Sequence, residues 1–378
     1  MSRSGIESIA REEIVALEPY RTARSIVSGG DDRGWIFLDA NESPWPGAGG
    51  AGSQLHRYPE PQPQPLLELA SSCFGADRSN ILMTRGVDEG IDLLLRAFCR
   101  PGVDSIAVCP PTYGFYGIAA RIQGASITEI PFVRDGRDFR LDLEGLRVEA
   151  DRELPARVLF LCSPNNPTGH SIPRDDVLAA CSVFEGKSIV ALDEAYVEFS
   201  GLESLVPRAG APENLVVFRT LSKAWGLAGA RFGLTFASPA VIDLLRKICA
   251  PYPLPTPTVE LVASAMSPEG RAETARRVTS LATEKRSLAE RLSQAGAIRE
   301  VLPGDANFVL VRVDEPSSFV NHLLARGIVV RDRSREPGLA GFVRISVGNR
   351  QESDALLDGV AAFDSDRAGD SSGKESDR

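Results

Sequence analysis

The sequence alternates between short apolar runs and segments in which apolar residues recur at helical spacing. The runs predict strands at 81–84, 105–109, 126–132, 158–161, 189–192, 215–218 and 231–237. Strands that alternate with helices are typical of an α/β fold with a mostly parallel sheet. Ligands of such sheets bind beyond the carboxyl ends of the strands. The residues that follow these runs are therefore the candidates for a functional site.

Polar or reactive residues follow five of the predicted strands. They are Gly86, Tyr113, Asn166, Asp193 and Lys223. Because the carboxyl ends of parallel strands share one edge of the sheet, we expect these residues to lie close together. Their convergence indicates one site that is formed by segments far apart in the chain.

Lys223 lies in the stretch 218–233, which reads FRTLSKAWGLAGARFG. Thr220, Ser222 and Arg231 provide small hydroxyls and a second cation beside the lysine. Such an amine can form a Schiff base with an aldehyde cofactor, while the hydroxyls and the cation hold a phosphate. A strand end followed by a solvated basic loop is the alternative for this stretch alone. Comparable neighbours are absent in the sequence around the remaining lysines, Lys187, Lys247, Lys285 and Lys374.

Gly86 precedes a predicted helix, and Asp193 ends a predicted strand. A helix start offers free backbone N–H groups and the positive end of the helix dipole, which suit an anion; an ordinary helix start is the alternative. A carboxylate at the end of a buried strand is costly unless it meets a cation, such as a protonated ring nitrogen. A helix cap or a structural ion pair would also explain Asp193.

Three further side chains suit a flat aromatic cofactor. Asn166, which precedes Pro167, and Tyr196 can donate hydrogen bonds to a phenolate oxygen. Tyr113 can stack on a ring, although both tyrosines can also be ordinary packing aromatics. Together with the lysine, the carboxylate and the phosphate-binding groups, these side chains specify pyridoxal 5'-phosphate.

Several motifs resemble those of known enzymes. The chain resembles the class I and II aminotransferases of fold type I in the segments SPNNPTG, DEAY and TLSKAWGLAGARFG. Within that group it is similar to the histidinol-phosphate aminotransferases in the segments DANESP, RYPEPQP, PPTYGFY, APYPLPTP and VRISVGNRQES. The similar region runs in order from about Leu38 to Phe363.

The resemblance implies an α/β fold with a mostly parallel seven-stranded sheet and a smaller α+β C-terminal domain. We place an N-terminal arm at 1–37, the large cofactor-binding domain at 38–260, the small domain at 261–364 and a polar, disordered tail at 365–378. In the last third of the chain, periodicity predicts helices at 239–250, 268–295, 317–326 and 352–363 and strands at 308–313, 328–331 and 342–347.

The resemblance also implies a role for each site residue. Lys223 would attach the cofactor and carry a proton, and Asp193 would keep the ring nitrogen charged. Asn166 and Tyr196 would bind the ring oxygen, and Tyr113 would stack on the ring. The cofactor phosphate would be held by Gly86, Val87, Asp88, Thr220, Ser222 and Arg231, and by Tyr58 from the other subunit of a homodimer.

For the substrate, the resemblance implies Arg344, Arg331, Tyr20 and Asn166. A guanidinium suits carboxylate and phosphate alike, although Arg331 can also be a solvated arginine at a strand end. The implied reaction moves an amino group between histidinol phosphate and 2-oxoglutarate, with glutamate as the other product, in histidine biosynthesis. An aromatic or specialised amino-acid aminotransferase and a decarboxylase of a phosphorylated amino acid are alternatives on the same scaffold.

Composition and charge argue against several other classes. The net charge of −9 disfavours a nucleic-acid binder. The six cysteines form no CxxC pair and the three histidines are scattered, so we expect no metal site. The sequence has no stretch long and apolar enough to span a bilayer and no apolar signal core, so we expect a cytoplasmic protein.

The segment 47–52 reads GAGGAG and formally fits the GxGxxG fingerprint of dinucleotide-binding proteins. That fingerprint needs a strand before it and a helix after it, whereas prolines flank this segment on both sides. We interpret it as a flexible loop. A nicotinamide-dependent dehydrogenase that uses this loop, and a binding protein without a cofactor, are the alternatives from other classes.

Overall fold

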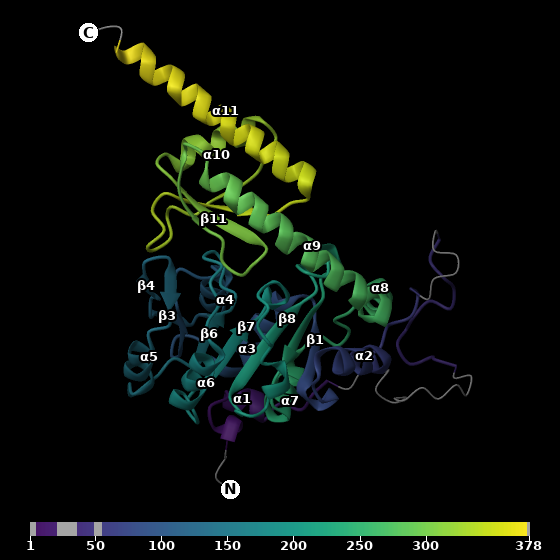
Figure 1. Cartoon of the computed structure of the whole chain (residues 1–378). Coiled ribbons are helices and arrows are strands. Elements are labelled where there is room, and N and C mark those ends of the chain that lie inside the picture. The colour runs from purple at the N-terminus through teal and green to yellow at the C-terminus, as the bar shows by residue number, and fades with distance from the viewer. Residues whose placement is uncertain (1–4, 21–35, 49–54, 376–378) are drawn as a thin grey trace.

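The computed structural model describes residues 5–20, 36–48 and 55–375 of the chain. A large domain lies below a smaller one in Figure 1, and helix α9 (Pro268–Ser293) runs from the large domain up to the small one. A short 3-10 turn (Gly5–Ser8) and helix α1 (Glu12–Val15) lie under the large domain.

The large domain is built on a seven-stranded sheet. Its strands, in spatial order, are β1 (Ile81–Thr84), β9 (Gly233–Phe236), β8 (Leu215–Thr220), β7 (Ile189–Asp193), β6 (Val158–Cys162), β2 (Ser105–Val108) and β3 (Ser126–Glu129). Only β9 pairs antiparallel with its neighbours, β1 and β8. The four remaining pairs are parallel, which confirms the predicted mostly parallel sheet.

Helices cover both faces of this sheet, which is why β6, β7 and β8 are buried along their whole length. Alternate strand residues point to opposite faces, so that Leu159 and Val217 join one core and Phe160 and Phe218 the other. The second core is closed by α3 (Val87–Phe98), α4 (Phe115–Gln123) and α7 (Pro239–Ile248). The first is closed by α2 (Gln64–Phe74), α5 (Leu143–Ala150), α6 (Arg174–Val183) and α8 (Thr256–Met266).

The small domain carries an antiparallel four-stranded sheet. Its strands, in spatial order, are β10 (Ile298–Leu302), β11 (Phe308–Val313), β13 (Phe342–Ser346) and β12 (Arg331–Asp332). Helices α9, α10 (Pro316–Ala325) and α11 (Arg350–Glu375) pack on one side of it through a separate apolar core. The predicted α+β character of this part of the chain is confirmed.

Several elements escaped the sequence analysis, namely α2, α5, α8, β10 and the hairpin formed by β4 (Val133–Asp135) and β5 (Asp138–Arg140). Helix α8 begins at the end of the proline-rich segment APYPLPTP. Pro255 is its N-cap and Pro257 falls in its first turn, where a missing N–H costs nothing. Strand β12 is also shorter than the predicted strand 328–331 and begins at its last residue.

Helix α11 extends beyond Phe363, where the sequence predicted the last helix to end. Its first turns are anchored by Leu356, Val360 and Phe363 in the core of the small domain. Helix α11 continues from there through a polar sequence to Glu375. The disorder predicted for 365–378 stays a prediction, and residues 376–378 lie outside the described part.

The two domains are fastened together at a pair of glycines. The backbone N–H of Asp305 donates to the carbonyl of Gly169 at 2.5 Å, and a Cβ on Gly304 would lie 2.7 Å from the backbone of Gly169. The Lys285 ammonium donates to the carbonyls of Gly304 and Ala306, both at 2.7 Å. The small domain is thus held against the loop that follows β6 and carries Asn166.

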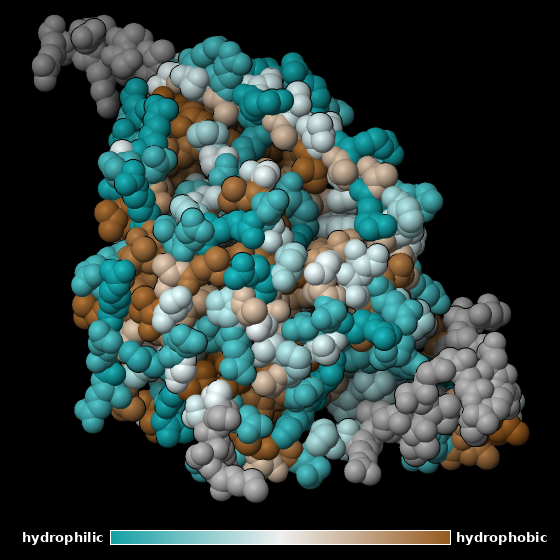
Figure 2. All heavy atoms as spheres, turned by 60° about the horizontal axis from the view of Figure 1, so that its bottom comes forward, coloured by the Kyte–Doolittle hydropathy of each residue, from teal (hydrophilic) through white to brown (hydrophobic). Residues whose placement is uncertain are grey.

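Figure 2 shows the face that lies at the bottom of Figure 1. Hydrophilic residues are spread over this face, and apolar residues lie between them. Within the described residues, none of the helices combines the length and the apolar character needed to cross a membrane.

Candidate active site

A pocket of about 640 Å³ lies between the carboxyl ends of the large sheet and strands β12 and β13 of the small domain. This volume is in the range of sites for small molecules and cofactors. Most of the predicted site residues line it: Val87, Asp88, Tyr113, Asn166, Asp193, Tyr196, Thr220, Ser222, Lys223, Arg231, Arg331 and Arg344. The structure therefore brings together residues from both domains, among them Tyr113, Asn166, Asp193 and Lys223, which were expected to lie close together beyond the strand ends.

The start of helix α3 forms one wall of the pocket. Its N-cap, Gly86, has a φ of 80° and provides no side chain to cap the helix, so the first backbone N–H groups are available to an anion. A Cβ on Gly86 would lie 2.7 Å from the Arg231 guanidinium. A Cβ on Gly233 would lie 2.5 Å from the Val87 nitrogen. Both glycines are required because β9, Arg231 and the helix start approach so closely.

The polar groups around this helix start fit a phosphate. Arg231 donates to Asp88 at 3.1 Å, and it holds a φ of 53°, which is uncommon for a residue with a side chain. The hydroxyls of Thr220 and Ser222 lie 3.0 Å apart at the end of β8. A cation, two hydroxyls and a helix N-terminus converge here, which is the donor set that a phosphate monoester requires.

Lys223 opens onto the pocket. Desolvation by the surrounding protein, and then the positive charge of Arg344, lower the pKa of its amine. Its Nζ lies 5.7 Å from the centre of the Tyr196 ring. A lowered pKa increases the fraction of neutral amine, which is the form that attacks a carbonyl carbon.

Asp193 ends β7 and is almost entirely buried at the bottom of the pocket. Its carboxylate accepts hydrogen bonds from the Tyr116 hydroxyl at 2.8 Å and from the Ala195 backbone at 3.0 Å. Burial nevertheless raises the pKa of Asp193 to about 6. No cation of the described protein pairs directly with this carboxylate, so the site suits a ligand that brings its own positive charge.

A chain of contacts connects the two domains across the pocket. The amide nitrogen of Asn166 donates to the Tyr196 hydroxyl at 3.3 Å, and Arg344 donates to the amide oxygen of Asn166. The Phe308 ring packs edge-on against Tyr196. The Arg344 guanidinium lies 5.2 Å from the centre of the Phe308 ring. Burial raises the pKa of Tyr196, so its hydroxyl stays protonated and able to donate.

Two predicted residues lie away from the pocket of their own chain. Tyr58 stacks on Tyr252, with ring centres 4.4 Å apart, and its backbone N–H donates to Glu42 at 2.6 Å. Glu42 also pairs with Arg57 at 2.8 Å, which joins the DANESP and RYPEPQP motifs. Tyr20 is 74% exposed at the end of the first described segment and is not brought to the pocket. Its contact with the substrate stays a prediction, as does that of Tyr58 with a cofactor.

The sequence analysis missed two residues that the pocket uses. Tyr116 lies one helical turn after Tyr113 on α4, and this i, i+3 spacing is the signal by which it could have been found. Arg333 lines the pocket beside Arg331 and Arg344. The sequence contains nothing that separates Arg333 from its exposed neighbour Arg335.

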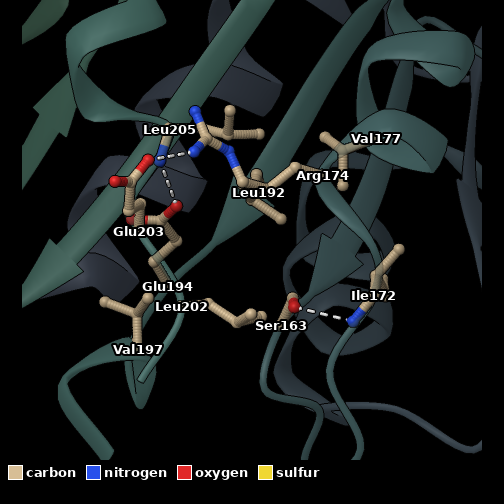
Figure 3. A pocket seen from close by; sticks show the side chains of 10 residues that line it. All are labelled: Ser163, Ile172, Arg174, Val177, Leu192, Glu194, Val197, Leu202, Glu203 and Leu205. Carbon is tan, nitrogen blue, oxygen red and sulfur yellow. Dashed lines mark hydrogen bonds and ion pairs between the residues drawn. The ribbon is translucent and has the colours of Figure 1, made fainter. Parts of the chain in front are cut away.

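The second carboxylate of the DEAY motif points away from the pocket, because successive residues of a strand face opposite sides. Glu194 accepts hydrogen bonds from the Ser204 hydroxyl and from the Leu205 backbone. Figure 3 shows it beside a separate cavity, lined mainly by apolar side chains such as Leu192, Val197 and Leu205. With a volume of about 20 Å³ this cavity has room for roughly one water molecule, so Glu194 is structural.

Comparisons with known proteins agree with this geometry. The family model described as aminotransferase class I and II matches residues 39–360. A histidinol-phosphate aminotransferase of Pectobacterium carotovorum subsp. carotovorum (strain PC1) is 40% identical over 94% of this chain and 97% of its own length. That of Escherichia coli O81 (strain ED1a) is 39% identical over 96% and 99%.

A solved structure supports the fold. The histidinol-phosphate aminotransferase from Sinorhizobium meliloti, in complex with pyridoxal-5'-phosphate, superposes with a TM-score of 0.75 at 24% identity. The superposition covers 84% of this chain and 85% of that one. The segment 47–52, which formally fits a dinucleotide fingerprint, lies largely outside the described residues.

Proposed function

The chain belongs to the class I and II aminotransferases, whose cofactor is pyridoxal 5'-phosphate, and we propose that it moves an amino group from histidinol phosphate to 2-oxoglutarate. The observation that carries the choice of substrate is the group of three arginines, Arg331, Arg333 and Arg344, at the small-domain side of the pocket. Relatives about 40% identical over nearly the whole chain are histidinol-phosphate aminotransferases, which supports this choice.

The pocket has the groups that the cofactor needs. Thr220, Ser222, Arg231 and the start of α3 would hold its phosphate, because they form the donor set described above. Asp193 would face its ring nitrogen and keep that nitrogen charged, which also relieves the cost of the buried carboxylate. When bound, the cofactor supplies an electron sink for the bond broken at the substrate carbon.

The side chains around the cofactor would carry the proton and orient the substrate. Lys223, with its lowered pKa, would take the proton from the substrate carbon that bears the amino group. Asn166 and Tyr196 present two donors to the ring oxygen, and Arg344, which contacts Asn166, binds the acidic end of the substrate. Tyr113 lines the same wall, where it can stack on the ring.

Histidinol phosphate has a phosphate ester in place of an α-carboxylate, and this decides between the alternatives on the scaffold. A donor with a phosphate dianion needs more positive charge than an amino acid with one carboxylate. Three guanidinium groups at the small-domain side of the pocket therefore favour the phosphorylated donor over an aromatic amino acid. A decarboxylase of a phosphorylated amino acid would also need this charge, and the products of the reaction distinguish it.

The test is a panel of donors offered to the purified holoenzyme. Histidinol phosphate, phenylalanine, ornithine and phosphothreonine are incubated separately with 2-oxoglutarate, and both glutamate and CO2 are measured. We expect glutamate to form fastest with histidinol phosphate, and no CO2. Faster glutamate formation with phenylalanine or ornithine would move the assignment to another aminotransferase, and CO2 from phosphothreonine would move it to a decarboxylase.

We also propose that the protein is a homodimer with shared active sites. The segment 36–48, which precedes Tyr58 in the chain, exposes large apolar side chains, among them Leu38 (88%) and Trp45 (74%), and on the right of Figure 1 it lies beyond α2. Helix α4 exposes Ile122 and also Ile118, which lines the pocket. Apolar surface of this kind, next to a site, supports a protein partner.

We place the enzyme in the cytoplasm. All six cysteines are free thiols, and four of them are buried. Free thiols without disulfides are typical of reducing compartments.

A further inference from the structure

Arg333 extends the cationic part of the pocket beyond the two arginines that the sequence indicated. It follows β12, and its backbone N–H donates to the Phe342 carbonyl at 2.9 Å. The turn after it is fixed by Ser334, whose backbone N–H donates to Asp332 at 2.8 Å. The main chain of Arg333 is therefore held in place, while its side chain lines the pocket.

Arg333 is paired with one carboxylate, and the pair is incomplete. Its Nη1 donates to Oε1 of Glu336 at 2.7 Å, and both side chains are about one quarter exposed. The Nε of Arg333 and the Oε2 of Glu336 are buried without a hydrogen-bond partner. A bidentate pair would give hydrogen-bond partners to Nη1 and Nε of Arg333 and to both carboxylate oxygens of Glu336. In the observed arrangement the Nε–H of Arg333 stays free to donate to a ligand, and separating Arg333 from Glu336 breaks one hydrogen bond instead of two.

The other two arginines lie opposite each other. Arg331 on β12 and Arg344 on β13 are direct partners in the antiparallel register. Like charges at directly opposed positions repel, and an anion in the pocket would relieve that repulsion. With Arg333 added, three guanidinium groups and one carboxylate, Glu336, surround this end of the pocket.

We propose that Arg333 determines specificity for a phosphate monoester: it leaves Glu336 to pair with the phosphate of the donor, and it stays on Glu336 when the bound substrate carries only carboxylates. This inference rests on the proposed function and deepens it. The same pocket must accept a phosphate in one half-reaction and a dicarboxylate in the other. If only a phosphate draws Arg333 away from Glu336, Arg333 adds a positive charge to the site when histidinol phosphate binds. It adds none when the dicarboxylate binds, so the dicarboxylate is not held too tightly.

The test compares Arg333→Gln with Arg335→Gln in the holoenzyme. Arg335 is exposed, lies two residues further along the same turn and does not line the pocket, so it controls for loss of a charge. Single half-reactions are followed through the cofactor absorbance with histidinol phosphate, with unphosphorylated histidinol and with glutamate. Arg333→Gln is expected to lower kcat/KM for histidinol phosphate about tenfold to a hundredfold, the effect of one charged hydrogen bond.

The other substrates show whether the loss is specific. With histidinol and with glutamate, Arg333→Gln should change kcat/KM by less than about threefold. Arg335→Gln should change kcat/KM by less than about threefold with all three substrates. Equal losses with histidinol phosphate and histidinol would show a structural role and overturn the proposal, and so would no loss at all. If the wild-type enzyme itself does not prefer histidinol phosphate, the proposed function is wrong as well. If wild type prefers it and Arg333→Gln keeps that preference, only the proposed role of Arg333 is wrong.

Glu336→Gln tests the second half of the proposal. It removes the carboxylate that holds Arg333 without removing Arg333 itself. The KM for glutamate should fall about threefold to tenfold, while kcat/KM for histidinol phosphate should not fall. An unchanged KM for glutamate would show that Glu336 does not restrain Arg333.

Discussion

Burial opposes the charge on Asp193, and the proposed role of this residue depends on that charge. Its pKa of about 6 lies above the ordinary value of 3.8, so the folded protein holds the proton more tightly than the unfolded chain does. Ionising the buried carboxyl of Asp193 therefore lowers the free energy of unfolding. This loss of stability is absent below the ordinary pKa, develops as the pH rises to about 6, and is complete above that. A protonated ring nitrogen beside the carboxylate would remove it.

The first prediction is that Asp193→Asn stabilises the cofactor-free protein while it impairs the enzyme. At about pH 8 the free energy of unfolding of the variant should exceed that of wild type by up to roughly 3 kcal/mol. The reason is that the pKa of Asp193 in the folded protein and its ordinary pKa differ by about two units. Turnover of the holoenzyme should fall at least about a hundredfold. Urea unfolding without cofactor and steady-state kinetics with it measure both effects. A variant less stable than wild type at that pH would contradict this explanation of the raised pKa.

The second prediction concerns Lys223. Lys223→Ala should abolish transamination and leave no cofactor covalently attached after borohydride reduction, because among the described lysines its amine is the one that lines the pocket. Lys187→Ala is the control, since Lys187 donates to the Ala150 carbonyl on the surface of the large domain. Mass spectrometry of the reduced proteins should show the adduct in wild type and in Lys187→Ala. An adduct retained in Lys223→Ala would overturn the role of this lysine.

At the scale of elements, the site depends on how closely β9 approaches the start of α3. Gly233 pairs with Thr84 of β1 and with Thr220 of β8, and its Cα faces the backbone of Gly86 and Val87. The helix start can present its N–H groups to a phosphate only while this packing persists.

The third prediction follows from this contact. Gly233→Ala should lower the free energy of unfolding by about 1–3 kcal/mol and weaken cofactor binding, because its Cβ would meet the Val87 nitrogen at 2.5 Å. Gly229→Ala, in the same loop region, is the matched control, since no atom lies within 4 Å of a Cβ there. Urea unfolding and titration with pyridoxal 5'-phosphate compare them. Similar results for the two variants would show that the close approach is unimportant.

The elements differ in how well the sequence predicted them, for physical reasons. The central strands are buried on both faces, so they are continuous apolar runs, and the polar residues after them lie together at one pocket. Helix α8 was missed because its prolines occupy the first turn, where they do not break a helix. Arg333 owes its role to a tertiary position at the pocket that no local pattern records, whereas the spacing from Tyr113 on α4 was the available signal for Tyr116, which contacts Asp193.

At the scale of the whole molecule, the pocket is assembled from two domains. Arg344 reaches Asn166 from the small domain, and Lys285 holds the loop of Gly304 and Ala306 against the large one. The proposed homodimer would add Tyr58 from a second chain, which agrees with the position of Tyr58 outside the pocket of its own chain.

The fourth prediction is that activity reappears when two inactive variants share a dimer. Tyr58→Phe and Lys223→Ala should each be nearly inactive alone. In a mixed dimer, one of the two sites receives an intact Tyr58 from one chain and an intact Lys223 from the other. The variants are mixed under conditions that exchange subunits, heterodimers are confirmed by native mass spectrometry, and turnover is measured. Confirmed heterodimers without activity would refute the shared site.

If this aminotransferase recognises its donor through the phosphate, removing the phosphate alone must slow the reaction. The wild-type holoenzyme is mixed in a stopped-flow instrument with histidinol phosphate or with histidinol, which differ only in that group, and the change in cofactor absorbance is followed. We predict a kcat/KM at least about a hundredfold higher with histidinol phosphate, because two or more charged hydrogen bonds from the arginines are at stake. Equal rates with the two donors would contradict the account.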